Sequence, residues 1–195
     1  MKTFLFVAFG VLLLTGCGQG QSGGGTNPVV DDDVHPQPQT ITVEEDDFKL
    51  SLFTNKAVYK EKEPVDIWAE FGFFGEEETM TIGHAMHYLG FYIEQTDGDL
   101  TFPYMMPEPY ILTTLKQGEW EKTDYEKSTG FVGGDPNAAF YKKWLEEDEV
   151  TFPPGTYKVT VVAHFIIDMS ENDLLTEREK TSYTMEQSLE FTVTR

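Results

Sequence analysis

The chain has 195 residues, a single cysteine and a formal net charge of −20, with 34 acidic and 14 basic side chains. A surface of this sign repels the phosphates of nucleic acids and the headgroups of anionic lipids. The composition therefore excludes nucleic acid as a partner, and one cysteine excludes an intramolecular disulfide.

The first 16 residues are typical of an export signal, which is removed from the folded protein. Lys2 supplies a positive charge, and the apolar run at residues 4–14 is shorter than the roughly 20 residues of a membrane-spanning helix. The sequence Leu14-Thr15-Gly16-Cys17 follows, and it resembles the lipobox of bacterial lipoprotein precursors. The resemblance implies cleavage between Gly16 and Cys17, and a diacylglyceryl lipid on the sulfur of Cys17.

This lipid predicts where the protein acts. Two or more acyl chains anchor a protein stably, so we expect it at the cell membrane, facing outside the cytoplasm. Cleavage also removes Lys2 and no acidic residue, which lowers the formal net charge from −20 to −21. An ordinary secretory signal with a chance cysteine is the alternative. We expect no cofactor beyond the lipid, and an extracytoplasmic protein as the partner.

Two regions are expected after the signal. Residues 17–47 combine glycine-rich, proline-containing and acidic stretches, which cannot bury enough apolar surface to order themselves. We therefore expect a lipid anchor followed by a flexible acidic linker. Residues 48–195 form the folded part, which is long enough for one core and too short for two domains of this kind.

Hydrophobic residues in the folded part alternate with polar ones, as in strands with one buried face. Turn signals rich in glycine, proline and aspartate separate the alternating segments. Seven or eight short strands with this spacing predict an all-β fold, an immunoglobulin-like antiparallel β-sandwich. The expected strands include residues 48–52, 65–71, 80–82, 89–93, 157–165 and 185–193.

A short helical insertion is expected at about residues 128–150, where the alternation is lost. Asp135 suits the N-cap of a helix and Pro136 its first position, and the helix would run through Trp144 and Glu147. We expect this helix to lie across one end or edge of the sandwich.

Tyr157 follows the turn Pro153-Pro154-Gly155-Thr156, near the start of a late strand. This position fits a tyrosine corner, in which the phenol hydroxyl bonds to the backbone a few residues upstream. A buried aromatic ring without such a bond is the alternative.

Five segments carry a family resemblance through their order and spacing. They are residues 50–59, 63–65, 89–99, 115–119 and 152–159, the last with the sequence Phe152-Pro153-Pro154-Gly155-Thr156-Tyr157-Lys158-Val159. Together they resemble the intracellular proteinase inhibitor family, also called BsuPI, which implies a small β-sandwich. That family inhibits proteinases in the cytoplasm, whereas this chain carries an export signal, so the proteinase partner is not carried over. Inhibition of an extracellular serine proteinase remains an alternative function, and residues 128–150 have no counterpart in the family.

Motifs of catalysis are missing from the sequence. The expected folded part contains no Gly-x-Ser-x-Gly elbow, and the chain has no His-Glu-x-x-His, no phosphate-binding loop and no Cys-x-x-Cys pair. An enzyme needs a nucleophile, a base or a metal in a defined arrangement. We therefore expect that the protein is not an enzyme, and we assign no catalytic residue.

His84, Met86 and His87 form the most suggestive metal-binding group. Imidazole and thioether ligands together suit copper. In an extended strand, His84 and Met86 would share a face while His87 points away, so the spacing supplies two ligands rather than a closed site. The alternative is that Met86 packs in the core and the histidines lie at a strand end.

Acidic clusters make calcium the second metal to consider. None of them matches the Asp-x-Asp-x-Asp-Gly loop with its distant glutamate, and charges in turns are usually only solvated. The clusters lie at residues 76–78, 97–99 and 146–149.

An apolar, proline-rich stretch contains Phe102, Tyr104, Met105, Met106 and Tyr110. It either covers an open end of the core or forms an exposed patch that binds a protein or a polysaccharide. Together with the lipobox, it predicts a membrane-anchored, non-enzymatic protein-interaction module. Metal binding and proteinase inhibition are the alternatives.

Overall fold

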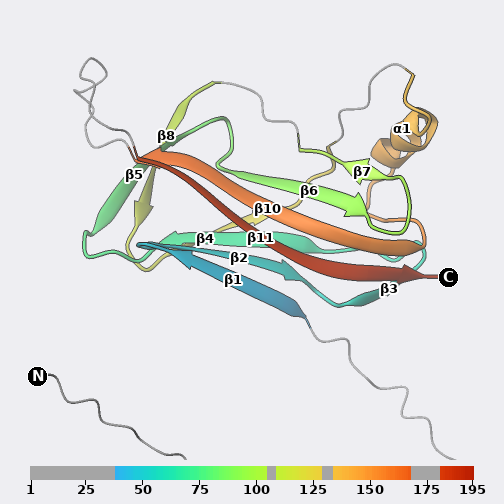
Figure 1. Cartoon of the computed structure of the whole chain (residues 1–195), viewed down its shortest axis with the longest axis horizontal. Coiled ribbons are helices and arrows are strands. Elements are labelled where there is room, and N and C mark those ends of the chain that lie inside the picture. Colours follow the sequence, from blue (N-terminus) through green and yellow to red (C-terminus); the bar gives the residue numbers. More distant parts are fainter. Residues whose placement is uncertain (1–37, 105–108, 129–133, 168–180) are drawn as a thin grey trace, which may run out of the picture. The chain divides into compact units, whose positions relative to one another are not determined.

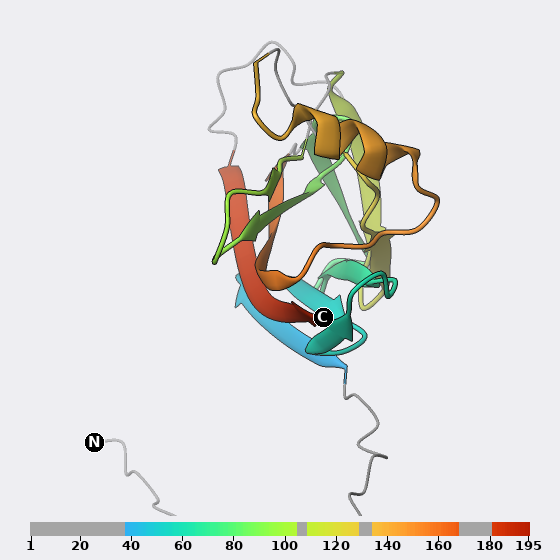
Figure 2. The same ribbon diagram turned by 90° about the vertical axis from the view of Figure 1, so that its right-hand side faces the viewer.

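The computed structural model describes residues 38–104, 109–128, 134–167 and 181–195. They form an all-β sandwich of two sheets with one short helix, as the sequence predicts. The two layers and the helix at one end are visible in two perpendicular views (Figures 1 and 2). Cys17, Gly16, Met105 and Met106 lie outside the described residues.

Sheet A contains four strands, and every neighbouring pair is antiparallel. In spatial order the strands are β1 (Gln39–Glu45), β2 (Phe48–Thr54), β4 (Ile67–Phe73) and β9 (Trp120–Asp124). The two edges of this sheet are therefore β1 and β9.

Sheet B contains seven strands and centres on the long strand β10. In spatial order its main path is β3 (Val58–Lys60), β11 (Thr181–Thr194), β10 (Gly155–Ile167), β5 (Thr79–His84) and β8 (Ile111–Lys116). Strand β6 (Leu89–Gln95) pairs with another part of β10 and with the two-residue strand β7 (Thr101–Phe102). Strands β3 and β11 are parallel, whereas the other paired strands of this sheet are antiparallel.

The core lies between the sheets and is built from alternating strand residues. Leu50 and Leu52 of β2, Phe71 of β4, Val159 of β10 and Phe191 of β11 are almost completely buried. Each such side chain contributes about 1.5–3 kcal/mol to folding through its removal from water. The predicted alternation of buried and exposed positions is thus confirmed in these strands.

Strand β1 corrects the predicted boundary of the folded part. Residues 39–45, which the composition placed in the flexible linker, pair over their whole length with β2. The hydroxyl groups of Thr42 and Ser51 are 2.8 Å apart, and Lys49 bonds to Glu44 at 2.7 Å. The sequence signal is weak because most of β1 is exposed on both faces and ends in two acidic residues.

Helix α1 (Ala138–Glu146) confirms the helical insertion but begins later than predicted. Its N-cap is Asn137 rather than Asp135, whose carboxylate accepts a hydrogen bond from the Asn137 backbone N–H at 2.7 Å. Asp135 therefore organises the turn before the helix, and Pro136 lies in that turn. Trp144 lies on the buried face of the helix and donates its indole N–H to the carbonyl oxygen of Thr151.

The tyrosine corner is confirmed. The Tyr157 hydroxyl donates a hydrogen bond to the carbonyl oxygen of Pro153, four residues earlier, at 2.8 Å. The Tyr157 ring is completely buried and stacks on Phe191 with a centroid distance of 5.2 Å. This bond fixes the turn that leads into β10.

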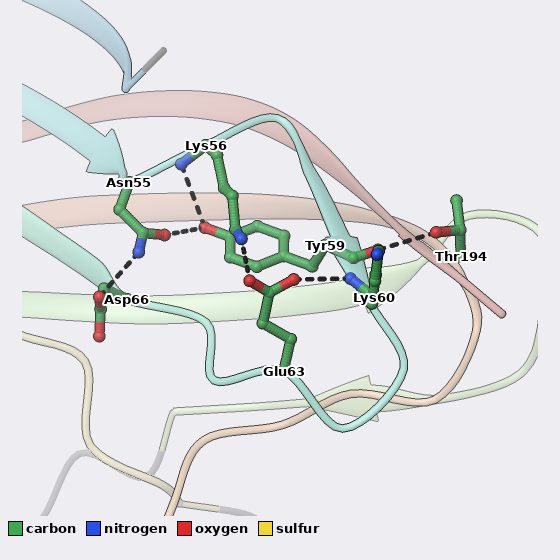
Figure 3. A network of polar contacts seen from close by, with 7 residues as sticks. All are labelled: Asn55, Lys56, Tyr59, Lys60, Glu63, Asp66 and Thr194. Atoms are coloured by element: carbon green, nitrogen blue, oxygen red, sulfur yellow. Dashed lines mark hydrogen bonds and ion pairs between the residues drawn. The ribbon is translucent and has the colours of Figure 1, made fainter. Parts of the chain in front are cut away.

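A network around Tyr59 ties the short strand β3 to the end of the chain (Figure 3). The Tyr59 hydroxyl donates to the side-chain oxygen of Asn55 and accepts the Lys56 backbone N–H at 3.3 Å. The Thr194 hydroxyl donates to the Tyr59 carbonyl oxygen at 3.1 Å. Burial raises the pKa of Tyr59 to about 12, so the hydroxyl keeps its proton.

An ion pair completes this network. The Lys56 ammonium group bonds to one carboxylate oxygen of Glu63, and the second oxygen accepts the Lys60 backbone N–H at 2.8 Å (Figure 3). The Lys56 ammonium also lies 5.0 Å from the centre of the Tyr59 ring. The hydrogen bond from Lys56 holds the pKa of Glu63 below its usual value.

Candidate functional site

The predicted metal group does not converge in the structure. His84 is buried at the end of β5, with its ring Nδ1 against the carbonyl oxygen of Ala85 and its Nε2 2.7 Å from the Thr113 hydroxyl. A carbonyl oxygen only accepts, so Nδ1 carries the proton and Nε2 accepts from Thr113. Both ring nitrogens of His84 are therefore engaged in hydrogen bonds.

Burial lowers the pKa of His84, which favours this neutral imidazole. Met86 is exposed, and His87 instead packs edge-on against Tyr104 with a centroid distance of 6.2 Å. Among the described residues, no three histidine, cysteine or acidic side chains lie close enough together to hold a metal ion. The geometry thus gives His84 a structural hydrogen-bonding role.

The predicted aromatic patch is divided among three environments. Phe102 is completely buried beneath α1, against Trp144 and Phe152 at centroid distances of 4.7 and 5.1 Å. Phe102 therefore belongs to the core, and its assignment to an exposed patch is wrong. Tyr104 lines a pocket and Tyr110 is 51% exposed.

A pocket of about 230 Å³ opens between β6 of sheet B and β9 of sheet A. It brings together three segments that are distant in sequence. Its walls contain Leu89 and Phe91 from β6, His87 before that strand, Tyr104, and residues 122–126.

Two tyrosines of this lining carry buried phenol hydroxyls. The hydroxyl oxygens of Tyr104 and Tyr125 are both buried, and neither has a hydrogen-bond partner among the described residues. Tyr125 is only 8% exposed and packs edge-on against Phe91 at 5.8 Å. Burial raises the pKa of both phenols, so both keep their protons at neutral pH.

Gly90 explains how Tyr104 reaches this position. A Cβ atom on Gly90 would lie 2.8 Å from the Tyr104 ring, closer than packed carbon atoms approach each other. The missing side chain allows the ring to lie directly on the backbone of β6. Gly90 is therefore a positioning residue for one wall of the pocket.

The edge of sheet B at β8 is the second feature of the surface. Strand β8 pairs with β5, and it pairs with no other strand in the described part of the chain. Leu112, the second residue of the strand, is 47% exposed, and Tyr110 immediately precedes the strand. From Ile111 to Leu115 the strand contains neither a charged residue nor a proline.

Backbone hydrogen bonds show which groups of β8 face outward. The Gln117 N–H donates to the Glu78 carbonyl oxygen at 3.0 Å, across the end of the β5–β8 ladder. Hydrogen-bonded pairs recur every second residue in an antiparallel ladder. The backbone groups of Leu112 and Thr114 therefore point toward the open edge.

The outer face of sheet A contains aromatic rings that the sequence did not single out as a group. Phe53 and Trp68 are stacked at 5.0 Å with nearly parallel planes, and Lys122 lies 5.3 Å above the Trp68 ring. Phe74 packs edge-on against Trp120 at 4.9 Å. Because these rings shield one another and lie under lysine stems, only Trp120 is strongly exposed.

Lys122 illustrates how the charges on this face are matched. Its ammonium group bonds to the Asp124 carboxylate at 2.6 Å. The Lys122 ammonium group therefore lies on the outer face of the sheet, although Lys122 is also part of the pocket lining.

Comparison with known proteins adds no family name. No protein-family model matches the chain, and no curated protein matches it. The resemblances to lipoprotein precursors and to the intracellular proteinase inhibitor family therefore stay predictions. No helix within the described residues has the length and apolar character to cross a membrane.

Proposed function

We propose that the protein is a lipid-anchored, extracytoplasmic, non-enzymatic module that binds a partner protein by adding a strand to the edge of β8. The observation that carries this proposal is the open, uncharged edge of that strand. Exposed edges present rows of backbone donors and acceptors that pair readily with another chain. Addition of an extended peptide to such an edge is a common mode of protein recognition.

The remaining edges of the two sheets make β8 the exception. Natural proteins protect open edges with charged residues, prolines or very short strands. Strand β9 contains Glu121, Lys122 and Asp124, and β1 ends in Glu44 and Glu45. Strands β3 and β7 have only three and two residues. Of β1, β8 and β9, strand β8 contains the fewest charged residues, with Lys116 at its end as the only one.

The side chains on β8 define the partner segment. Leu112 offers apolar surface beside the outward backbone groups, so the added strand should carry an apolar residue opposite it. The formal charge of −20 favours a partner whose flanking residues are basic. These features support an extended, apolar segment of a basic extracytoplasmic protein.

Proximity labelling on intact cells tests this proposal with the full-length lipidated chain. Leu112→Lys places a charge on the open edge, and Thr114→Pro removes an outward N–H group, so both variants should lose the labelled partner. Leu145→Lys is the matched control, because Leu145 on α1 has a similar exposure of 40%. Leu145→Lys should label the same partner as the wild type.

The outcomes are distinguishable if folding is followed in parallel by circular dichroism. Loss of the partner in both edge variants, with folding intact and the control unchanged, supports strand addition. Equal labelling by the wild type and both edge variants contradicts it.

A further inference from the structure

Three turns that are distant in sequence meet at one end of the sandwich. The Phe74 N–H donates to the Asp47 carbonyl oxygen at 2.7 Å, which joins the β4–β5 turn to the β1–β2 turn. The Gly118 N–H donates to the Phe73 carbonyl oxygen at 2.8 Å, which brings the β8–β9 turn to the same place. Figure 1 shows all three turns at the left-hand end of the sandwich. This end lies opposite the start of β1, where the predicted tether joins the fold.

An exposed aromatic pair lies beside these turns, on the outer face of sheet A. Trp120, the first residue of β9, is 41% exposed, and the Phe74 ring packs edge-on against it at 4.9 Å. A Cβ atom on Gly72, which is opposite Trp120 in the ladder, would lie only 2.9 Å from the Phe74 ring. The missing side chain therefore lets Phe74 lie against the backbone of β4 beside Trp120. Tryptophan is among the side chains that most often carry the binding energy of protein interfaces.

The charge around this aromatic pair is strongly negative. Seven exposed acidic residues lie on or beside the three turns, and we call them, together with Trp120 and Phe74, the acidic turn surface. They are Glu45, Asp46, Asp47, Glu76, Glu77, Glu78 and Glu119. Within the described part of the chain, Glu119 is the only one of the seven with an ion pair, which it forms with Lys116 at 3.4 Å. The other six carboxylates are therefore available to a cationic partner.

Trp120 is the ring of the pair that is open to such a partner. The Lys49 ammonium lies 5.1 Å from the centre of the Phe74 ring and is bonded to Glu44. Among the described residues, no lysine or arginine lies over the Trp120 ring. Tryptophan is the aromatic side chain that attracts cations most strongly.

The arrangement of the carboxylates determines which cation fits. A metal ion needs converging ligands, and no three acidic or histidine side chains of the described residues come together in that way. Carboxylates spread over three turns instead suit several cationic groups along an extended segment. The guanidinium group of arginine forms bidentate hydrogen bonds with carboxylates and stacks flat on aromatic rings, whereas the ammonium group of lysine is a compact point charge. Arginine therefore complements both parts of the surface.

We propose that the acidic turn surface docks a basic, arginine-containing segment of a partner protein. One arginine stacks on Trp120, and neighbouring arginines pair with Glu76, Glu77 and Glu78. The surface adjoins the Lys116 end of β8 but contains no residue of that strand. The proposal therefore goes beyond strand addition at the β8 edge, and either proposal can fail without the other.

Fluorescence anisotropy tests the proposal with the full-length lipidated chain in nanodiscs of phosphatidylcholine, which carries no net charge. The probes are labelled hexapeptides in which glycine alternates with arginine, with lysine or with glutamate. The salt concentration is about 150 mM, at which the general attraction to the acidic chain is screened beyond about 8 Å.

Two variants alter the surface, and one matched variant controls for net charge. Trp120→Ala removes the exposed ring. A triple variant, Glu76→Gln with Glu77→Gln and Glu78→Gln, removes three charges from the β4–β5 turn. The control triple variant removes three exposed charges at the end of α1, through Glu146→Gln, Asp148→Asn and Glu149→Gln. Circular dichroism checks that each variant is folded.

The arginine peptide should bind saturably and more tightly than the lysine peptide, and the glutamate peptide should not bind. Trp120→Ala should weaken binding of the arginine peptide roughly 2- to 5-fold, the effect of one exposed cation–π contact. The triple variant of the β4–β5 turn should weaken it by at least about 3-fold, and the control triple variant should leave it unchanged. Absence of saturable binding, equal binding of the arginine and lysine peptides, wild-type binding by Trp120→Ala, or equal weakening by both triple variants would overturn the proposal.

Discussion

The hydroxyl of Tyr157 bonds to the carbonyl oxygen of Pro153 at 2.8 Å, whereas the buried hydroxyl of Tyr125 has no partner among the described residues. The two tyrosines thus represent opposite solutions to the burial of a phenol. The Tyr157 hydroxyl holds the turn that leads into β10, and Tyr125 is a residue of the pocket lining.

This contrast predicts opposite effects of the same substitution. Tyr157→Phe should lower the free energy of unfolding by about 1 kcal/mol, because it removes a satisfied hydrogen bond and leaves the Pro153 carbonyl without that donor. Tyr125→Phe should leave the free energy unchanged or raise it, because it removes an unsatisfied group. Urea denaturation of the two variants measures both changes. A larger loss in Tyr125→Phe than in Tyr157→Phe would contradict the assignment.

The Lys56–Glu63 ion pair predicts a dependence of stability on pH. The folded state lowers the pKa of Glu63 below its usual 4.5. The pair therefore contributes stability at neutral pH, and this contribution falls as the pH drops below 4.5 toward the folded-state pKa. Glu63→Gln should remove the part of the acid-induced loss of stability that comes from this pair.

Urea denaturation between pH 3 and pH 7 compares the wild type with Glu63→Gln. Glu119→Gln is the control, because the Lys116–Glu119 pair at 3.4 Å is far more exposed and exposed pairs contribute little. The free energies of unfolding of the wild type and Glu63→Gln should differ most near neutral pH and approach each other at low pH. A constant difference across this range would argue against the ion pair as its source.

Phe102 should be far more important for stability than Tyr110, although both lie in one apolar stretch of the sequence. Phe102→Ala leaves a cavity among Trp144, Tyr141 and Phe152, so we expect a loss of about 3–5 kcal/mol. Tyr110→Ala removes a side chain that is about half exposed and should cost less. Thermal denaturation followed by circular dichroism ranks the two variants. Similar losses would indicate that Phe102 is not part of the core.

Cys17→Ser tests the predicted lipid anchor. Serine cannot form the thioether to the lipid, so the variant should move from the membrane fraction to the soluble extracytoplasmic fraction. The wild type should also incorporate radioactive palmitate, and the variant should not. Because the described fold begins at Gln39, the variant should retain the circular dichroism spectrum of a folded sandwich. Membrane retention of Cys17→Ser would count against anchoring through this residue.

The strands of the core were predictable because their two faces differ strongly. Leu50 and Leu52 alternate with polar neighbours, as do Tyr157, Val159 and Val161 in β10. In contrast, β1 has little burial on either face, and its alternation is limited to two apolar residues, Ile41 and Val43. β3 and β7 have only three and two residues, too few for a periodic pattern. Local sequence therefore identified strands that bury a face and missed strands that mainly extend an edge.

The candidate sites were less predictable, because they depend on contacts between distant segments. His87, Tyr104 and Tyr125 meet in one pocket only through the pairing of strands in two sheets. The hydrogen bond between the His84 ring and Thr113 joins residues that are 29 positions apart, so the local sequence could not indicate it. The uncharged run from Ile111 to Leu115 was visible in the sequence, but its position at an open edge was not.

The start of β1 and the end of β11 lie at the same end of the folded unit, because the side chain of Gln39 bonds to the Glu190 carbonyl oxygen at 2.8 Å. The domain is therefore suited to circular permutation, in which a short linker joins the old ends and new ends open in an exposed turn. The turn at Gly118, between β8 and β9, is one such place. A permutant opened there should keep the sandwich. Its membrane tether would then be attached beside β9 instead of β1, so the opposite end of the domain would face the membrane.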